Sequence, residues 1–106
     1  MSAQSNGDVH VTDTPDRSRY EIAVAGKVAG FAQYQLQGER IVFTHTEVDD
    51  AYQGEGIAGH LARAALDSAR QRSLQVTPKC DYIAGYIRKH PEYTDLVDEQ
   101  DRSLIQ

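Results

Sequence analysis

The first half of the chain alternates apolar and polar residues with the period of two that β-strands show. The segment VHVTDT alternates, TPDRS supplies turn residues, and YEIAV continues the alternation. The turn AGK and the pair Gly38–Glu39 then separate two further extended segments, residues 28–36 and 40–48. Because these connections are of hairpin length, the pattern predicts strands in an antiparallel meander.

Beyond Gly54 the apolar residues follow the spacing of an α-helix instead. They form a stripe along one side, and charged residues fall on the other; the stripe consists of Ile57, Ala58, Leu61, Ala62, Ala65, Leu66 and Ala69. The segment LQVTP then predicts a short buried strand that ends at Pro78. A second amphipathic helix follows over residues 81–89 and stops before Pro91. A meander, a helix, a strand and a helix define an α+β fold.

Length and charge exclude several classes of protein. A chain of 106 residues predicts one domain with a modest core, and we expect the small, polar residues 1–7 to form a flexible tail. The net charge of -5 argues against binding to nucleic-acid phosphates, since such proteins carry a basic face. No apolar run approaches the roughly 20 residues that a membrane helix needs. We therefore expect no nucleic-acid or membrane partner.

The cysteine and histidine content narrows the kinds of site. The only cysteine, Cys80, cannot form an internal disulfide, which is typical of a reducing cytoplasm. The first ten residues, MSAQSNGDVH, lack the basic and apolar regions of a signal peptide. One cysteine and four scattered histidines show no ligand spacing for zinc. These features predict a cytoplasmic protein without a metal cofactor.

Three glycines, Gly54, Gly56 and Gly59, fit the pattern G-x-G-x-x-G of a dinucleotide-binding turn. That site needs a βαβ unit in a parallel sheet, and Asp81 lies near the position of its acidic residue. However, only one strand follows the glycine helix, and the hairpin connections before it forbid parallel pairing. A Walker phosphate loop also fails, because no Lys-Ser or Lys-Thr pair follows the glycines.

The same segment matches a second pattern, Gln/Arg-x-x-Gly-x-Gly/Ala, between Gln53 and Ala58. This pattern opens a helix after a long strand in acetyl-CoA-dependent acyltransferases. Small residues let a diphosphate approach the backbone, and the unpaired N–H groups and dipole of the first helical turn attract it. The alternative interpretation is a glycine-rich turn that serves only to start a helix.

The neighbouring segments carry a wider resemblance. HTEV is followed by GEGIA, PKC and RKHPEY, and YEIAVAGKVAGFAQY lies upstream. In this combination, over about residues 20–97, the chain resembles the GNAT superfamily of N-acetyltransferases, and in particular its short stand-alone YjdJ-type group. The resemblance implies one GNAT-like domain over residues 8–106. Its fold would be a mixed, mostly antiparallel sheet with splayed central strands, a glycine-loop helix and a C-terminal helix.

The resemblance also implies a binding mode. The strand of residues 40–48 would part from the strand around residues 74–77, and the pantetheine arm would pair with the backbone in that gap. The implied donor is acetyl-CoA, and the residues that would bind coenzyme A are Thr46, Val48, Gln53, Gly54, Glu55, Gly56, Ile57, Ala58 and Gly59. Only TPDRS joins the first two strands, where larger members carry helices that cover the acceptor. We therefore expect an open acceptor site.

Acetyl transfer to an amine needs an unprotonated amine, a donor to the carbonyl oxygen and a proton for the leaving thiolate. The resemblance implies a backbone N–H near Val48 as the oxygen donor. His45 and Glu47 are candidate bases, because residues two apart in a strand share a face and histidine exchanges protons near neutral pH. The alternatives are a half-buried strand histidine and a solvated glutamate.

Cys80 is the third catalytic candidate. It directly precedes the helix of residues 81–89, so its sulfur could face the helix N-terminus, a position that favours the thiolate. It could give a proton to the sulfur of CoA or accept the acetyl group itself. A buried cysteine that only packs is the alternative. Tyr82 and Tyr86 are further candidate proton donors, for which core packing is the favoured interpretation.

Together these features predict a cytoplasmic N-acetyltransferase that moves an acetyl group from acetyl-CoA to a small-molecule or protein amine. The alternative is a non-catalytic acyl-CoA-binding module that works through a partner, which the small size and missing acceptor cover favour. We expect His60 on the solvated side of its helix. His90 and Tyr93, in the segment KHPEY, are expected to fix the C-terminal turn rather than to contact substrate.

Overall fold

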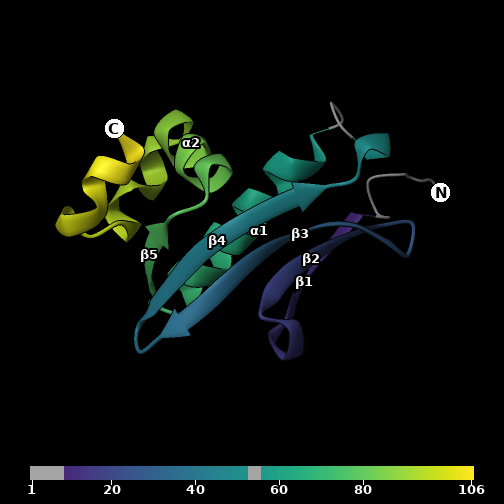
Figure 1. The fold of residues 1–106 in the computed structure, drawn as a ribbon, viewed down its shortest axis with the longest axis horizontal. Coiled ribbons are helices and arrows are strands. Elements are labelled where there is room, and N and C mark those ends of the chain that lie inside the picture. The colour runs from purple at the N-terminus through teal and green to yellow at the C-terminus, as the bar shows by residue number, and fades with distance from the viewer. Residues whose placement is uncertain (1–8, 53–55) are drawn as a thin grey trace.

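A five-stranded sheet with strand order β1-β2-β3-β4-β5 forms the frame of the protein (Figure 1). The computed structural model describes residues 9–52 and 56–106. The strands are β1 Val9–Thr14, β2 Arg19–Val24, β3 Lys27–Gln37, β4 Arg40–Val48 and β5 Gln75–Pro78. Neighbouring strands pair antiparallel from β1 to β4, whereas β5 pairs parallel to β4. The predicted meander and the mixed, mostly antiparallel sheet are confirmed.

Short turns hold the meander in register. A short 3-10 helix, η2 (Pro15–Arg17), joins β1 to β2, in agreement with the turn predicted at TPDRS. Ala25 and Gly26 join β2 to β3 with φ values of 51° and 82°. Two consecutive residues with positive φ are typical of the hairpin turn whose twist matches that of its strands. The local sequence therefore determines where each strand reverses.

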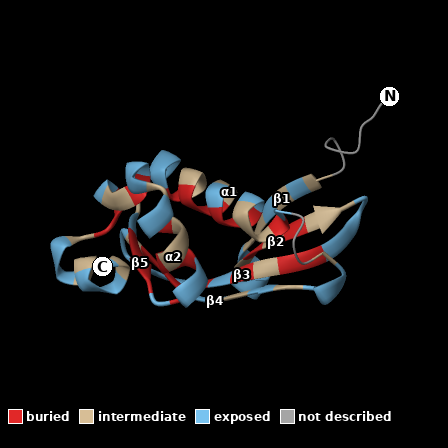
Figure 2. Ribbon diagram, turned by 90° about the horizontal axis from the view of Figure 1, so that it is seen from above, coloured by how far each residue is buried: buried red, intermediate tan, exposed pale blue. Residues whose placement is uncertain are grey.

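The long helix α1 (Ile57–Gln71) lies against β1 to β5 with its apolar stripe. Ala62, Ala65 and Ala69 are fully buried, and such small side chains let the helix axis approach the strands closely. Figure 2 shows the buried residues gathered between α1 and the sheet. The predicted stripe is confirmed, except that Ala58 is only half-buried.

The C-terminal third surrounds the short strand β5. The helix α2 (Asp81–Lys89) has the predicted bounds, and it is followed by two 3-10 helices, η4 (Pro91–Leu96) and η5 (Glu99–Ile105). A further short 3-10 helix, η3 (Asp50–Tyr52), follows β4. The sequence did not predict η4 or η5, since only Tyr93 and Leu96 of η4 are buried and η5 has no buried residue, too few for an apolar pattern. Within residues 9–52 and 56–106, no helix has the length and apolar character needed to cross a membrane.

The two parallel strands stay together over a short distance only. In the described part of the chain, β4 pairs with β5 from Arg40 to Phe43. The carbonyl of Phe43 accepts a hydrogen bond from the N–H of Cys80 (3.0 Å), and the chain then enters α2. Meanwhile β4 continues to Val48, paired with β3 but not with β5. This divergence, visible in Figure 1, confirms the predicted splay of the central strands.

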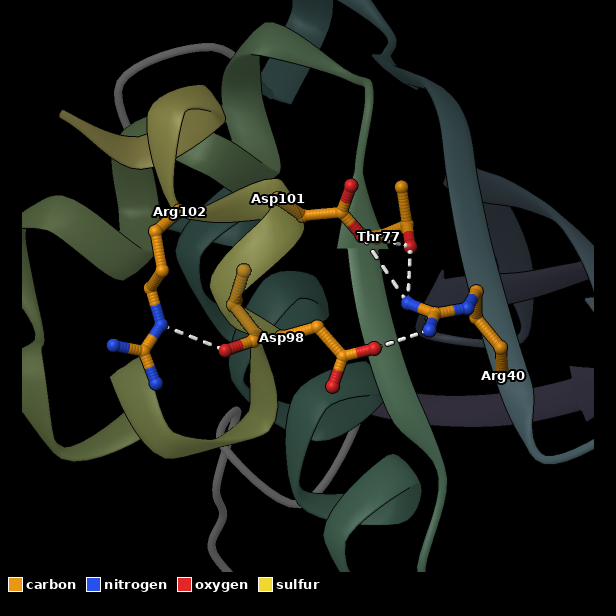
Figure 3. Close-up of polar contacts among 6 residues, drawn as sticks. Arg40, Thr77, Asp98, Asp101 and Arg102 are labelled. Carbon is orange, nitrogen blue, oxygen red and sulfur yellow. Dashed lines mark hydrogen bonds and ion pairs between the residues drawn. The ribbon is translucent and has the colours of Figure 1, made fainter.

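A polar cluster joins the two strands at their paired end (Figure 3). One guanidinium nitrogen of Arg40 donates to the hydroxyl of Thr77 (2.9 Å) and to the carboxylate of Asp101 (3.1 Å). The other guanidinium nitrogen of Arg40 donates to the carboxylate of Asp98. The Thr77 hydroxyl itself donates to Asp101 (2.7 Å). The Arg40 cluster (Arg40, Thr77, Asp98 and Asp101) therefore ties β4 and β5 to the C-terminal segment.

Replacing Arg40 with methionine should destabilise the fold by about 2 kcal/mol, because two carboxylates would lose their shared cation in a partly buried place. Urea denaturation measures the change in the free energy of unfolding. The control is Arg17→Met, since Arg17 is 66% exposed and its ion pair with Glu21 spans 3.6 Å. That variant should lose no more than about 0.5 kcal/mol. Equal losses in both variants would contradict a structural role for the Arg40 cluster.

Candidate functional site

The backbone of β4 beyond Phe43 forms one side of the gap between the strands. Consecutive residues of a strand direct their N–H and C=O groups to alternate sides. Because the N–H of Asp49 donates to the Ala29 carbonyl on β3 (2.8 Å), the N–H groups of Val48 and Thr46 point away from β3. They point toward the side on which β5 lies. Two residues predicted to bind CoA thus direct backbone groups into the gap.

Thr46 and Cys80 meet at the point where the strands part. Thr46 is paired with buried Ala32, so its side chain lies on the face of the sheet that α1 covers. The Cys80 thiol donates a hydrogen bond to the Thr46 hydroxyl, with 3.2 Å between sulfur and oxygen. Cys80 precedes the first residue of α2 and is only 7% exposed. Two of the predicted site residues are therefore in contact here.

His45 and Glu47 lie on the opposite face of β4. The Nε2 atom of His45 is 3.1 Å from a carboxylate oxygen of Glu47, and both side chains are more than half exposed. The ring of Phe31 lies next to the imidazole, with 6.0 Å between ring centroids. The expectation that His45 and Glu47 share a face is confirmed. However, they do not share that face with Thr46, so the predicted catalytic residues are divided between the two sides of the strand.

The N-terminus of α1 begins at a glycine with unusual backbone geometry. Gly56 has a φ of 76°, and its carbonyl accepts the N–H of His60 (3.0 Å). The N–H groups of Ile57, Ala58 and Gly59 come before this first hydrogen bond of the helix, and N–H groups in that position have no partner within their own helix. The helix dipole adds a partial positive charge there. Three residues predicted to bind CoA, Gln53, Gly54 and Glu55, lie outside the described residues.

A groove of about 430 Å³ runs from this N-terminus along α1 toward α2. Its lining residues on α1 recur at helical spacing, and Tyr86 of α2 forms the opposite wall; the lining is Gly56, Gly59, His60, Arg63, Ala64, Asp67 and Tyr86. A side chain at Gly59 would approach Tyr82 and Tyr86, to within 3.8 and 3.9 Å. The exposed position of His60 agrees with prediction. The sequence did not predict Arg63 as a residue of this groove. Its position four residues after Gly59 places both on the same side of a helix and could have indicated it.

The aromatic residues after Tyr86 hold the far wall of this groove in place. The imidazole of His90 stacks on the ring of Tyr86, with 3.9 Å between ring centroids. The Nδ1 atom of His90 also forms a hydrogen bond with the backbone carbonyl of Tyr86 (2.8 Å). The hydroxyl of Tyr93 donates to Asp67 of α1 (2.7 Å). Burial, together with this bond to a carboxylate, raises the pKa of Tyr93 to about 12. These contacts agree with the structural role expected of His90 and Tyr93.

A second hollow, of about 470 Å³, lies at the open end of β4. Its lining includes the carboxylates of Glu47, Asp49 and Asp50, together with Thr46 and Val48. Three acidic residues so close together give this end of the strand a negative charge, which favours cations. Among residues 9–52 and 56–106, no three His, Cys, Asp or Glu side chains gather in the manner of metal ligands.

Comparison with known proteins identifies the family. The model of the GCN5-related N-acetyl-transferase family matches residues 19–96. Protein NATD1 of mouse is 37% identical over 90 residues, which cover 83% of this chain and 82% of the mouse protein. Protein NATD1 of human is 49% identical over 59 residues, 55% of this chain and 52% of the human protein. The chain belongs to the GCN5-related N-acetyltransferase family.

Solved structures show the same fold. The ribosomal-protein-S18-alanine N-acetyltransferase of Escherichia coli superposes with a TM-score of 0.55 at 19% identity, over 70% of this chain and 55% of that protein. Ard1 of Thermoplasma volcanium superposes with a TM-score of 0.52 at 24% identity, over 57% of this chain and 43% of that protein. The chain thus spans about half the length of these two proteins. The predicted GNAT-like fold is confirmed.

Proposed function

We propose that this protein binds acetyl-CoA and transfers the acetyl group to an amine. The observation that carries the proposal is the gap beyond Phe43, together with the start of α1 at Gly56, a few residues after the end of β4 in the chain. The gap offers backbone groups for an extended arm, and the helix N-terminus offers N–H groups for phosphates. Family membership supports the same conclusion, because residues 19–96 match the model of N-acetyltransferases.

The nucleotide end of acetyl-CoA would lie at the start of α1. Its diphosphate would accept hydrogen bonds from the N–H groups of Ile57, Ala58 and Gly59. Gly56 supports this arrangement, because apart from its neighbours in the chain no described residue has an atom within 4 Å of the place where its side chain would project. His60 and Arg63 line the adjoining groove. An exposed guanidinium there would add attraction for phosphate charge.

The pantetheine arm would follow β4 toward Val48. Its amide groups suit the outward backbone groups of Thr46, in the manner of an added strand. The thioester would then lie close to the contact between Thr46 and Cys80. In the transfer, the amine nitrogen forms a bond to the carbonyl carbon, and the bond from that carbon to sulfur breaks. A backbone N–H near the end of β4 would stabilise the oxygen as it gains negative charge.

Two proton transfers complete the reaction. The sulfur leaves with the bonding electron pair, and a protonated Cys80 would supply its proton. The attacking nitrogen must lose a proton, for which the pair of His45 and Glu47 on the open face is the proposed acceptor.

The acceptor would be an amine that arrives as a cation, on a small molecule or a protein. The hollow at the end of β4 supports this choice, because Glu47, Asp49 and Asp50 all line it. Carboxylates attract an ammonium group during its approach, and they do so more strongly at low salt. Only the short 3-10 helix η2 joins β1 to β2, so no longer helix that could cover an acceptor is inserted between those strands.

A non-catalytic acyl-CoA-binding module is the second candidate, and the same short connection supports it. Incubation with acetyl-CoA and a panel of amines, followed by mass spectrometry, distinguishes the two. We expect acetylated amine in amounts that exceed the protein, at a rate that falls as salt rises. Saturable CoA binding without product would support the module. Absence of CoA binding would contradict both candidates.

Gly56→Ala should weaken CoA binding about tenfold, equivalent to about 1.4 kcal/mol, because the added methyl group would face the diphosphate. Alanine is preferable to a branched residue, since the φ of 76° is strained for any side chain. Isothermal titration calorimetry measures the affinity. Gly38→Ala is the control: Gly38 also has a positive φ (63°) and open space around it. Both variants should lose about 1 kcal/mol of stability, and only Gly56→Ala should lose affinity for CoA. Unchanged affinity in Gly56→Ala would disprove the placement of the diphosphate at the start of α1.

Cys80→Ala should lower kcat about tenfold, as expected for a lost proton donor, while CoA affinity stays within about twofold. Cys80→Ser keeps a hydroxyl that can bond Thr46 and should recover part of the rate. The intact mass of the wild-type protein should not change after exposure to acetyl-CoA alone. An acetyl adduct that hydroxylamine removes would instead assign Cys80 as an acyl acceptor. Full activity in Cys80→Ala would leave Cys80 with a packing role.

A further inference from the structure

Two arginines of the C-terminal third differ from the other arginines of the chain. The remaining six each lie within ion-pair distance of a carboxylate; they are Arg17, Arg19, Arg40, Arg63, Arg70 and Arg72. Arg88 and Arg102 have no such partner among residues 9–52 and 56–106. Because acidic residues outnumber basic ones by 16 to 11, a shortage of carboxylates does not explain the difference.

Both of these arginines line one hollow of about 450 Å³. Arg88 belongs to the last turn of α2 and Arg102 to η5, two elements that contact each other. The hollow is completed by Thr94, Ile105 and Gln106, so none of its lining side chains is a carboxylate. Two positive charges that face the same space repel each other, and an anion placed between them would relieve that repulsion.

The guanidinium of Arg102 is held on one side and open on the other. Its Nε atom donates to the backbone carbonyl of Val97 (2.7 Å), and Val97 is only 1% exposed. In Figure 3 its two terminal nitrogens lie on the side of the segment away from Arg40. Asp95 interacts with the charge of Arg102, but both of its carboxylate oxygens already accept hydrogen bonds from Arg70 (2.9 and 3.0 Å). Within the described part of the chain, the terminal N–H groups of Arg102 have no acceptor.

We infer that this hollow binds the phosphate group of a small organic molecule. Guanidinium groups hold phosphate oxygens through paired hydrogen bonds, and the anchored Arg102 is preorganised for such contacts. The hydroxyl of Thr94 and the amide of Gln106 are further donors in the lining. The volume exceeds what a bare ion fills and lies in the range of small-molecule sites, roughly 300 to 1,000 Å³. Ile105 offers an apolar contact to the organic part of the ligand.

The ligand would act on the segment that holds the sheet together. Asp98 directly precedes η5 and Asp101 lies within it, and both bind Arg40 of β4. A phosphate that bridges α2 and η5 would fix this segment in place, so binding should raise the Tm of the protein. The hollow is distinct from the start of α1, where the proposed function places the diphosphate of CoA. The inference therefore does not rest on that function.

A titration of the isotope-labelled protein with phenyl phosphate tests the inference through the amide resonances of the hollow. The ionic strength is kept constant, because nonspecific attraction between charges changes with salt. We expect saturable shifts at Arg88, Thr94 and Arg102. Inorganic phosphate should bind more weakly at the same residues, because it has no organic part to contact Ile105. Shifts at residues 57–59 are followed separately, since phosphate can also bind at the N-terminus of a helix.

Matched variants assign the binding to the two arginines. Arg88→Gln and Arg102→Gln should each raise the Kd for phenyl phosphate about tenfold, because each removes charged hydrogen bonds to the phosphate. Lys89→Gln removes the same charge from a neighbouring residue that does not line the hollow, and it should change the Kd by less than about twofold. Arg88→Gln leaves the bond from Arg102 to Val97 intact, so it tests the site even if Arg102→Gln fails to fold. Phenyl phosphate should raise the Tm of the wild type and of Lys89→Gln more than that of Arg88→Gln.

Absence of saturable shifts at Arg88, Thr94 and Arg102 would overturn the inference. Equal weakening in Lys89→Gln and Arg88→Gln would overturn it too, because that result describes diffuse attraction to a positive surface. Equal affinity for phenyl phosphate and inorganic phosphate would rule out an organic ligand. If CoA displaces phenyl phosphate from these residues, the hollow belongs to the CoA site and a separate ligand is disproved. A protein that binds phenyl phosphate here but binds no CoA would contradict the proposed function and support this inference.

Discussion

The parting of β4 from β5 after Phe43 is the constraint on which the rest of the molecule depends. Parallel strands that remain paired satisfy each other's backbone groups. Here the Phe43 carbonyl accepts the N–H of Cys80, and β4 continues to Val48 without β5 beside it. Polar backbone groups along such an edge require a partner, whether from solvent, another part of the chain or a ligand. A bound extended arm is one partner that would suit such an edge.

The geometry of the gap is determined by packing at both ends of β4. At the paired end, the Arg40 cluster joins both strands to the C-terminal segment. At the open end, the glycine at position 30 lets the last peptide of β4 lie against β3. Because neither device needs a ligand, the position of the strand is established before anything binds. Catalysis benefits from such preorganisation, since donors already in place need no rearrangement during the reaction.

The sequence predicts those parts of the fold that have a local cause. The alternation in β1 to β4 and the helical stripe of α1 each follow from the spacing of buried residues. By contrast, η5 is held by Arg40 contacting Asp98, residues that lie 58 positions apart, and no local pattern records such a pair. In the sequence, Gly30 resembles any glycine that weakens a strand. Only its distance to the Glu47 carbonyl shows why a side chain would not fit.

The candidate site was predictable in part for the same reason. The glycine pattern indicates a helix start from sequence alone, whereas the opposite wall of the groove comes from Tyr86, on a different helix. The faces of β4 depend on an irregularity between Gln33 and Tyr34, because one extra residue changes the side to which later side chains point. Counting by two along the strand relates His45 to Glu47 correctly, but it does not reveal that Cys80 contacts Thr46 on the other face.

The division of β4 into two faces gives the proposed reaction a spatial order. Acetyl transfer brings two reactants together, and each needs a different proton transfer. A thioester that lies along the strand edge would have Cys80 and Thr46 on the face covered by α1, where water is scarce. An amine from solvent would arrive on the open face, beside His45, Glu47 and the acidic hollow. Alternation along one strand would thus keep the proton donor and the proton acceptor apart, so neither neutralises the other before the amine and the thioester meet.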